Sequence, residues 1–370
     1  MIIAINTRIL SEDHSINNFL QEVFSRIIVS NPEHEFIFIT EKKYDPPCNL
    51  FKNVKTLVIE QQSTNPLLWK LWYNYKLPAA LKKINADLLV TVDGVCSLRC
   101  KLPQLLLVKD LGLLQHADCY PKKYTRFIQS KSNSFLQKAT TIITSTQILK
   151  ENLVSKLGIA ENKIAVIYPG VIPLLTPMEW EQTNQIKEKF TEGKEYFLYN
   201  GPLHLQGNLI NLLKAFSIFK KRQKTNMQLI IAATGIKENE YFIKSLQLYK
   251  YRSEVILLHN PEEINLITAA AYAIISPAIF ENNFSILLNA LQCKVPVLAG
   301  NTNVNIEILG NAAGYINPDM VDDIAEKMML LFKDEKYRAT LIENGLQQAA
   351  KFSWNKAADE LWQQMLLTIE

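Results

Sequence analysis

Glycine is scarce in this sequence. The chain of 370 residues contains only 12 glycines, whereas the usual share is roughly 7% of residues. Proteins that bind phosphate groups commonly place glycine in tight loops, because a residue without a side chain lets the backbone approach closely. The low glycine content therefore argues against a phosphate site built from glycine-rich loops.

Cysteine is also sparse and follows no metal-binding pattern. The five cysteines are Cys48, Cys96, Cys100, Cys119 and Cys293. Cys96 and Cys100 form the only close pair, and no second pair or nearby histidine completes a zinc pattern. We therefore expect no metal, no other cofactor, and reduced thiols of the kind found in the cytoplasm.

Long apolar runs and a strong net charge are absent as well. The opening stretch "MIIAIN" is followed by charged residues at 8, 12 and 13, so we predict a buried strand rather than a signal peptide. The net charge of +4 is small, and no long run of like charge occurs. These features argue against nucleic-acid binding and favour a cytoplasmic protein.

The sequence does contain short apolar runs that alternate with amphipathic stretches. Hydrophobic residues make up 48% of the chain, and its length exceeds the usual size of a single core, which suggests two domains. The predicted strands of the first half are 2–5, 36–40, 88–92, 105–108, 141–145 and 164–168. Continuous apolar strands of this kind are typical of a parallel sheet covered by helices on both faces.

The pattern changes at residues 168–195, which hold three prolines, two glycines and many polar residues. The alternation then resumes, with predicted strands at 196–200, 229–233, 255–258, 272–276 and 295–300. We predict an α/β protein with a doubly wound domain over 1–172, a linker over 173–194 and a second doubly wound domain over 195–352. Ligands are expected beyond the carboxyl ends of the strands, in the cleft between the domains.

Several blocks of the sequence resemble one enzyme family in their order and spacing. They include "LLLVKDLGLLQHADCYPKKY" at 105–124, "YFLYNGPLHLQGNLINLLKAF" at 196–216 and "PEEINLITAAAYAIISPAIFENNFSILLNALQCKVPVLAG" at 261–300. The chain thus resembles the retaining GT-B glycosyltransferases of family 4, also called group 1. The resemblance implies two Rossmann-like domains facing a cleft, with residues 353–370 as a last helix that crosses back to the first domain.

The same resemblance implies transfer of a sugar from a UDP- or GDP-linked donor to a glycan or lipid-linked acceptor, with retention of configuration. The second domain would bind the donor and the first the acceptor. The family needs no metal, because positive groups and helix N-termini stabilise the leaving diphosphate.

The family's Glu-x7-Glu motif corresponds to Glu281 and Asn289. The resemblance places Glu281 near the donor sugar as a catalytic residue and Asn289 near the ribose, where an amide oxygen accepts hydrogen bonds more weakly than a carboxylate does. Phe284 and Ser285 are also expected on the donor side, near a position that is commonly glycine. The alternative is an ordinary loop that leads into a buried helix.

The loop after the strand 196–200 corresponds to the family's phosphate clamp. Gln206 and Gly207 stand where an arginine and a lysine usually hold the diphosphate, and each lost contact is worth on the order of a few kcal/mol. Gly201, His204, Gln206 and Gly207 are nevertheless expected at the donor. His204 would substitute in part for the lost charges; the alternative is a solvated loop histidine.

On the acceptor side, Lys109 and Asp110 replace the family's His-Asp pair after the strand 105–108. Both are expected near the transferring centre; the alternative is a charge pair at a strand end without a catalytic role. The first loop, residues 6–19, lacks the family's glycine-rich turn, and Arg8 and His14 are its expected acceptor-side residues.

These departures leave two hypotheses. One is a retaining glycosyltransferase with an altered site. The other is a catalytically degenerate GT-B protein that binds a glycan, a nucleotide or a partner glycosyltransferase. The stretch "NPLLWKLWYNYKLPAALKK" at 65–83 combines aromatic residues with lysines. It is consistent with a peripheral contact at the inner face of the membrane; the alternative is core packing of the aromatic residues with solvated lysines.

Overall fold

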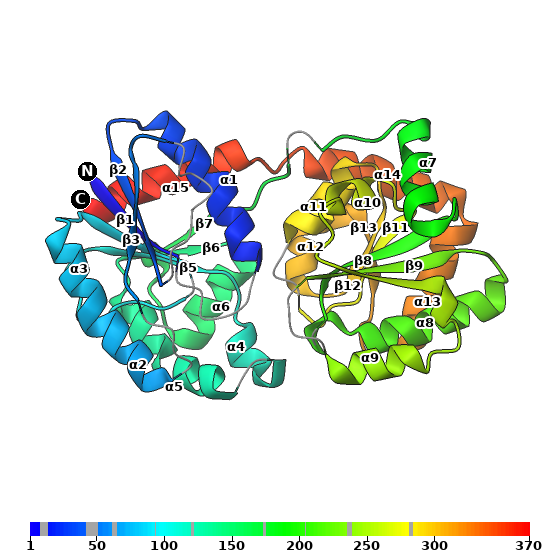
Figure 1. Cartoon of the computed structure of the whole chain (residues 1–370), viewed down its shortest axis with the longest axis horizontal. Helices are drawn as coiled ribbons and strands as arrows, with labels where there is room; N and C mark the ends of the chain where they lie inside the picture. Colours follow the sequence, from blue (N-terminus) through cyan, green and yellow to red (C-terminus); the bar gives the residue numbers. More distant parts are fainter. Residues whose placement is uncertain are drawn as a thin grey trace. The chain divides into compact units, whose positions relative to one another are not determined.

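The chain forms two compact units, each built on one parallel sheet (Figure 1). The computed structural model describes residues 1–7, 14–41, 51–60, 65–92, 94–119, 122–172, 175–203, 205–234, 239–280 and 284–370. The first unit comprises Met1–Pro169 and Trp354–Glu370, and the second comprises Gly170–Ser353. The sequence-based limits of the two domains lie at 172 and 352.

The sheet of the first unit has the strand order β3-β2-β1-β4-β5-β6-β7. Its strands are β1 (Ile2–Asn6), β2 (Glu35–Thr40), β3 (Val54–Val58), β4 (Leu88–Thr91), β5 (Gln104–Val108), β6 (Thr141–Thr144) and β7 (Ile164–Val166). All neighbouring strands run parallel. The order reverses between β1 and β4, and doubly wound sheets bind ligands beyond such a switch point.

The sheet of the second unit repeats this arrangement in the order β10-β9-β8-β11-β12-β13. Its strands are β8 (Tyr196–Pro202), β9 (Gln228–Thr234), β10 (Val255–His259), β11 (Ala273–Ser276), β12 (Val297–Gly300) and β13 (Ala313–Ile316), again all parallel. Its switch point lies between β8 and β11. The predicted doubly wound α/β architecture is therefore confirmed for both units.

Helices cover both sheets. The first unit contains α1 (His14–Ser30), α2 (Pro66–Leu71), a π-helix (Trp72–Lys76), α3 (Leu77–Lys83), α4 (Gly112–Gln115), α5 (Lys122–Lys138), α6 (Gln147–Leu157) and α15 (Trp354–Ile369). The second unit contains α7 (Trp180–Thr191), α8 (Leu209–Gln223), α9 (Glu240–Gln247), α10 (Ile264–Ala269), α11 (Phe284–Gln292), α12 (Asn303–Leu309), α13 (Val321–Lys333) and α14 (Glu335–Ala349). Within the described part of the chain, none of the helices combines the length and the apolar character needed to cross a bilayer.

The strands are buried on both faces, as their continuous apolar sequences predict. In β8, Tyr196 and Leu198 belong to the hydrophobic core on one face of the sheet, whereas Phe197 and Tyr199 belong to the core on the other. Successive side chains of a strand point to opposite faces. A strand with a helix layer on each side therefore needs apolar residues at every position.

The helical stretch 66–83 contains a π-helical turn in its middle. The Leu77 N–H donates to the carbonyl of Trp72, five residues earlier. Pro78 follows directly and has no N–H of its own, so it cannot continue the regular α-helical ladder. The Asn74 side chain stabilises the turn, because its Nδ2 donates to the Lys70 carbonyl at 3.0 Å and its Oδ1 accepts from the Leu98 N–H at 2.9 Å.

The linker predicted over 173–194 is wrong in its second part. Residues Trp180–Thr191 form α7, which packs on α10 within the second unit. Ile186 is buried in the core of that unit, while most of the other side chains of α7 face solvent. A helix with so few buried positions looks like a polar linker in the sequence.

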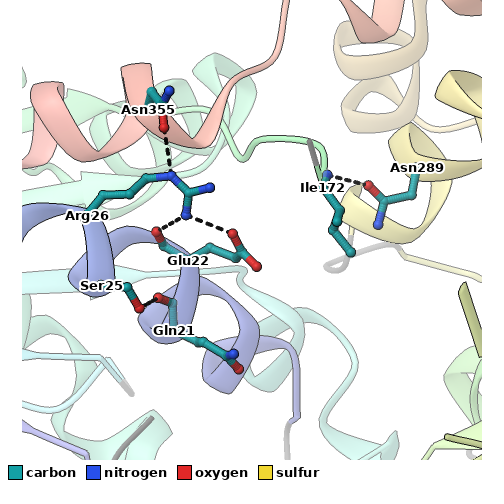
Figure 2. Close-up of polar contacts among 7 residues, drawn as sticks. All are labelled: Gln21, Glu22, Ser25, Arg26, Ile172, Asn289 and Asn355. Atoms are coloured by element: carbon teal, nitrogen blue, oxygen red, sulfur yellow. Dashed lines mark hydrogen bonds and ion pairs between the residues drawn. The ribbon is translucent and has the colours of Figure 1, made fainter. Parts of the chain in front are cut away.

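The last helix, α15, lies in the first unit and packs on α1. The rings of Phe19 and Trp354 meet edge to face, with centroids 5.9 Å apart. The Arg26 side chain donates from Nε to Asn355 Oδ1 at 2.7 Å and forms an ion pair with Glu22 at 2.8 Å (Figure 2). The backbone thus crosses between the units twice, once at each end of the second unit.

Candidate functional site

The two loops at the switch point of the second sheet are joined by hydrogen bonds. The loop after β8 contains Gln206, whose carbonyl accepts from the Ile279 N–H at 3.0 Å in the loop after β11. The Gln206 side chain is buried, and its Nε2 donates to the Phe280 carbonyl at 3.0 Å. A neutral amide therefore joins the two loops at the switch point, where ligands approach sheets of this kind.

Asn208 joins a third loop to this edge. Its Nδ2 donates to the Pro277 carbonyl after β11 at 3.1 Å and to the Pro318 carbonyl after β13 at 2.6 Å. Asn208 has a φ of 53°, a left-handed conformation that asparagine tolerates better than most residues do. Since Asn208 directly precedes α8, the free N–H groups of that helix begin at the same edge.

Gly207 is required by close packing. A Cβ atom on Gly207 would lie 2.2 Å from the Tyr199 hydroxyl oxygen and 2.8 Å from the Pro202 carbonyl oxygen. The Tyr199 hydroxyl itself donates to the Pro202 carbonyl at 2.8 Å. A Cβ on Gly201 would also approach the Tyr199 hydroxyl, at 2.7 Å. Tyr199 thus fills the space that a side chain at position 207 would need.

The helix α11 holds the segment that enters the second unit. Asn289 is buried, and its Oδ1 accepts from the Ile172 N–H at 3.0 Å (Figure 2). One turn later, Gln292 Nε2 donates to the carbonyls of Ile172 at 3.1 Å and of Leu175 at 2.6 Å. The amide of Asn289 therefore has a structural partner 117 residues away in the sequence.

The other donor-side residues of α11 differ in their surroundings. Phe284, the first residue of the helix, is buried in the core of the second unit. Ser285 is half-buried in the first turn. The N-terminal turn of α11 thus combines an apolar anchor with a small hydroxyl side chain.

In the first unit, Lys109 and Asp110 follow β5 at the carboxyl edge of the sheet. Asp110 Oδ1 accepts from the Gly112 N–H at 2.6 Å and so shapes the turn before α4. The Lys109 carbonyl accepts from the Ser145 hydroxyl at 3.3 Å, after the neighbouring strand β6. The structure thus places this pair one strand away from the switch point between β1 and β4.

The switch point of the first sheet carries two polar residues that sequence reasoning missed. Asn6 ends β1, Thr91 ends β4, and they are paired in the register of the two strands. Both are fully buried, and Asn6 Nδ2 lies 3.5 Å from the Tyr73 hydroxyl. Each is a single polar residue within an apolar run or at its end, and this pattern could have identified them.

Three of the predicted site residues lie outside the described structure, and the side chain of a fourth does as well. Glu281, His204 and Arg8 are not described, and neither is the side chain of His14. Their roles stay predictions.

The loops at the carboxyl edge of the second sheet are poor in positive charge. In sequence, the segments 203–208, 235–239, 260–263, 277–283, 301–302 and 317–320 contain one lysine, no arginine and five acidic residues. Among the residues that the structure describes, no three His, Cys, Asp or Glu side chains gather as a metal site would require. An anion at the described edge would therefore meet backbone N–H groups and helix N-termini rather than charged side chains.

Family models match both units of the chain. The model described as "Glycosyl transferases group 1" matches residues 181–348, and that described as "Glycosyltransferase Family 4" matches residues 31–173. The chain belongs to the GT-B glycosyltransferases. Its GT-B fold also appears in HepE from Anabaena, solved with UDP and glucose, at a TM-score of 0.78 and 14% identity over 99% of each chain.

Two curated glycosyltransferases are similar in sequence to this GT-B chain. The O-antigen chain mannosyltransferase B of Escherichia coli is 21% identical over 68% of this chain and 67% of its own length. The second, from Campylobacter jejuni, is named as an α-1,4-N-acetyl-D-galactosaminyltransferase acting on a GalNAc-containing glycan on PP-undecaprenol. It is 22% identical over 91% of each chain.

The motif positions of the GT-B family are thus occupied in an unusual way. Gln206 and Gly207, at the clamp positions, serve the packing of the loops. Asn289, at the second position of the two-acid motif, accepts from the Ile172 backbone. The recognition of the family is confirmed, while the functional assignment of these residues stays a prediction.

Proposed function

We propose that the chain transfers a sugar from a UDP- or GDP-linked donor to a glycan or lipid-linked acceptor with retention of configuration. The donor would bind at the switch point of the second sheet, close to Glu281. The observation that carries the proposal is the hydrogen-bonded bridge between Gln206 and Phe280. It fixes the loop before α8 to the loop before α11, so that both helix N-termini begin at one edge.

In this proposal the backbone, rather than cationic side chains, holds the diphosphate. The first turns of α8 and α11 offer the N–H groups that a helix leaves without an intrahelical partner, and the positive end of the helix dipole. Such donors stabilise the charge that develops on a leaving diphosphate without needing a metal ion. Because charge-assisted contacts contribute about 1.5–3 kcal/mol each, we expect weaker nucleotide binding than with an arginine and lysine clamp.

The acceptor would bind at the carboxyl edge of the first sheet, near Lys109 and Asp110. The name of the Campylobacter relative includes a polyprenyl diphosphate carrier, and this supports an acceptor of the same class. A lipid-linked acceptor would bring the protein to the cytoplasmic face of the membrane as a peripheral protein.

A second candidate function is favoured by two observations at the donor edge. Tyr199 leaves no room for a clamp side chain at position 207, and the Asn289 oxygen is already bonded to the Ile172 N–H. A GT-B chain with these features could bind a glycan, a nucleotide or a partner glycosyltransferase without catalysing transfer.

Isothermal titration with UDP, GDP, UDP-glucose and GDP-mannose tests the proposal. We expect measurable binding of one nucleotide family and release of the nucleoside diphosphate when an acceptor extract is added. Binding without any release would favour the second candidate. No binding of any of the four ligands would contradict the donor site itself.

A matched pair of variants at Gln206 sharpens the titration. Gln206→Arg restores a positive charge and can still donate to the Phe280 carbonyl, so we expect about tenfold tighter UDP binding. In Gln206→Met the new side chain has a similar length but no hydrogen-bond donor. This variant therefore measures the effect of losing the hydrogen bond to the Phe280 carbonyl alone. Equal affinities in both variants would show that position 206 does not face the diphosphate.

A further inference from the structure

Asn200 is a polar residue in the otherwise hydrophobic strand β8. The residues before it, Tyr196–Tyr199, are all buried in the cores of the second unit, and asparagine is depleted in strands. The Asn200 side chain is half-buried, and its Oδ1 is buried without a hydrogen-bond partner among the described residues. Burying a polar atom without a partner costs free energy. Folding alone therefore gives no reason for an amide at this position.

Asn200 lies at the carboxyl edge of the second sheet, on the face covered by α11. Alternate residues of a strand share a face, and Leu198 belongs to the same core as Phe284 of α11. Leu198 pairs with Ile274 of β11, so the register brings Ser276 beside Asn200, two residues further along both strands. An amide and a hydroxyl side chain are therefore neighbours at the switch point.

The first sheet has the same two kinds of side chain at its switch point, where Asn6 of β1 pairs with Thr91 of β4. The amide of Asn6, however, lies within hydrogen-bond distance of the Tyr73 hydroxyl, at 3.5 Å. Tyr73 comes from the π-helical turn of the same unit. The first unit thus supplies a partner for the amide of its asparagine, whereas the described part of the second unit supplies none for Asn200 Oδ1.

The chemistry of the amide selects its partner. A carboxamide has an acceptor oxygen and a donor nitrogen, and a sugar hydroxyl likewise both donates and accepts. A phosphate oxygen of a nucleoside diphosphate only accepts, so it cannot donate to Asn200 Oδ1. The unpartnered oxygen therefore fits a hydroxyl-bearing part of a nucleotide sugar rather than its diphosphate.

The position of Asn200 favours the sugar over the ribose. The strand β8 leads to α8 and its neighbour β11 leads to α11, and the diphosphate is proposed to lie at the N-termini of these two helices. In a nucleotide sugar the diphosphate is bonded directly to the anomeric carbon of the sugar. The hydroxyl on the next carbon of the sugar is therefore closer to the diphosphate than the two ribose hydroxyls are.

We propose that Asn200 is a specificity-determining residue whose carboxamide binds the hydroxyl next to the anomeric carbon of the transferred sugar. This inference rests on the proposed function, because it assigns Asn200 to the donor site at the same switch point. The cost of the buried oxygen in the free chain would be offset when the sugar binds.

The variant Asn200→Leu tests the proposal, because leucine has the same branched shape without polar atoms. Isothermal titration uses UDP, GDP, UDP-glucose and GDP-mannose. The sugar nucleotide that the parent chain binds is expected to bind the variant about fivefold more weakly, the effect of one neutral hydrogen bond. The corresponding nucleoside diphosphate should bind equally well to both chains. A merely structural role of Asn200 would change both affinities together.

A donor analogue tests the same contact in the parent chain, without any substitution. In the 2-deoxy-2-fluoro analogue of the bound sugar nucleotide, fluorine replaces the hydroxyl next to the anomeric carbon and cannot donate a hydrogen bond. We expect the parent chain to bind this analogue about fivefold more weakly than the sugar nucleotide. Asn200→Leu should bind the two ligands with equal affinity.

Gln228 provides a matched control at the opposite edge of the sheet. It begins β9, its side chain is buried, and its Oε1 also has no partner among the described residues. Asn200→Leu and Gln228→Met should each raise the melting temperature by about 2–4 °C, because each replaces a buried unpartnered amide with an apolar side chain of similar shape. Gln228→Met should leave the affinity for the sugar nucleotide unchanged.

The outcomes separate this inference from the proposed function. If the parent chain binds none of the four ligands, the proposed function fails and the assignment of Asn200 fails with it. If the parent chain binds a sugar nucleotide and Asn200→Leu binds it as tightly, only the assignment of Asn200 is overturned. Equal weakening of the sugar nucleotide and its nucleoside diphosphate also overturns it, and so does a parent chain that binds the fluoro analogue as tightly as the sugar nucleotide.

Discussion

The two units share one strand order but differ at their switch points. In the second unit, side-chain amides join the loops after β8, β11 and β13, through Gln206 and Asn208. In the first unit, Asn6 and Thr91 end the strands at the switch point, and the charged pair Lys109 and Asp110 follows one strand away. The first unit also carries the positive charge surplus.

This difference shows how amide side chains can replace charged ones at a sheet edge. An amide both donates and accepts, whereas lysine and arginine only donate and a carboxylate only accepts. Asn208 satisfies two backbone carbonyls, and Asn289 satisfies one backbone N–H. The amides therefore stabilise the loops of the second unit without adding charge.

The largest effect on stability is expected when a side chain is introduced into the closely packed site at position 207. Gly207→Lys would restore the clamp lysine of the family, but its Cβ would clash with the Tyr199 hydroxyl and the Pro202 carbonyl. We expect a loss of about 3 kcal/mol in the free energy of unfolding, typical of an overpacked site. Urea denaturation measures it. Tyr199→Phe removes the hydroxyl, so the double variant should recover part of the loss, and strictly additive losses would contradict this packing account.

A smaller loss of stability is expected when Asn208 is replaced. Asn208→Ala leaves the Pro277 and Pro318 carbonyls without this donor and puts a less tolerant residue at a φ of 53°. We expect about 2 kcal/mol of destabilisation, measured by urea denaturation. Asn208→Gly removes the same hydrogen bonds but accepts the backbone conformation, so it should cost less. Equal losses would show that the backbone conformation contributes nothing.

Asn289 separates the structural and the nucleotide-binding interpretations of its position. Asn289→Ala should cost about 1 kcal/mol of stability, because the Ile172 N–H loses its acceptor. Asn289→Glu restores the carboxylate of the family motif and should tighten nucleotide binding in isothermal titration if this position faces the ribose. Unchanged affinity with Asn289→Glu would remove position 289 from the ribose site.

A further effect on stability is confined to alkaline pH and to the second unit. Burial raises the pKa of Tyr249 and of Tyr315, each to about 12, whereas tyrosine in an unfolded chain titrates near 10. The folded state therefore keeps protons that the unfolded state loses, and stability is constant below about pH 10 and falls between pH 10 and 12. Tyr315→Phe should flatten this fall in denaturation curves measured across that range. If stability falls as steeply with pH in Tyr315→Phe as in the parent chain, Tyr315 does not contribute to the fall.

Most of the fold could be predicted because its strands are continuous apolar runs. Two edge strands were missed. In β3 (Val54–Val58) the pattern is broken by exposed positions, and β13 (Ala313–Ile316) is only four residues long and contains a glycine. Helix α7 was missed because its polar surface resembles a linker. A strand or helix that is short or buries few side chains leaves only a weak hydrophobic signal in the sequence.

The sequence by itself determined the class of fold, the family and the positions at which charges are missing. Only the tertiary structure decided what replaces them, because Gln206 meets Phe280 and Asn289 meets Ile172 across long stretches of chain. It also decided that Leu67 and Leu71, rather than Trp69 and Trp72, face solvent. Such pairings depend on how the loops and helices pack around the sheets, and hydrophobic periodicity along the chain carries no information about them.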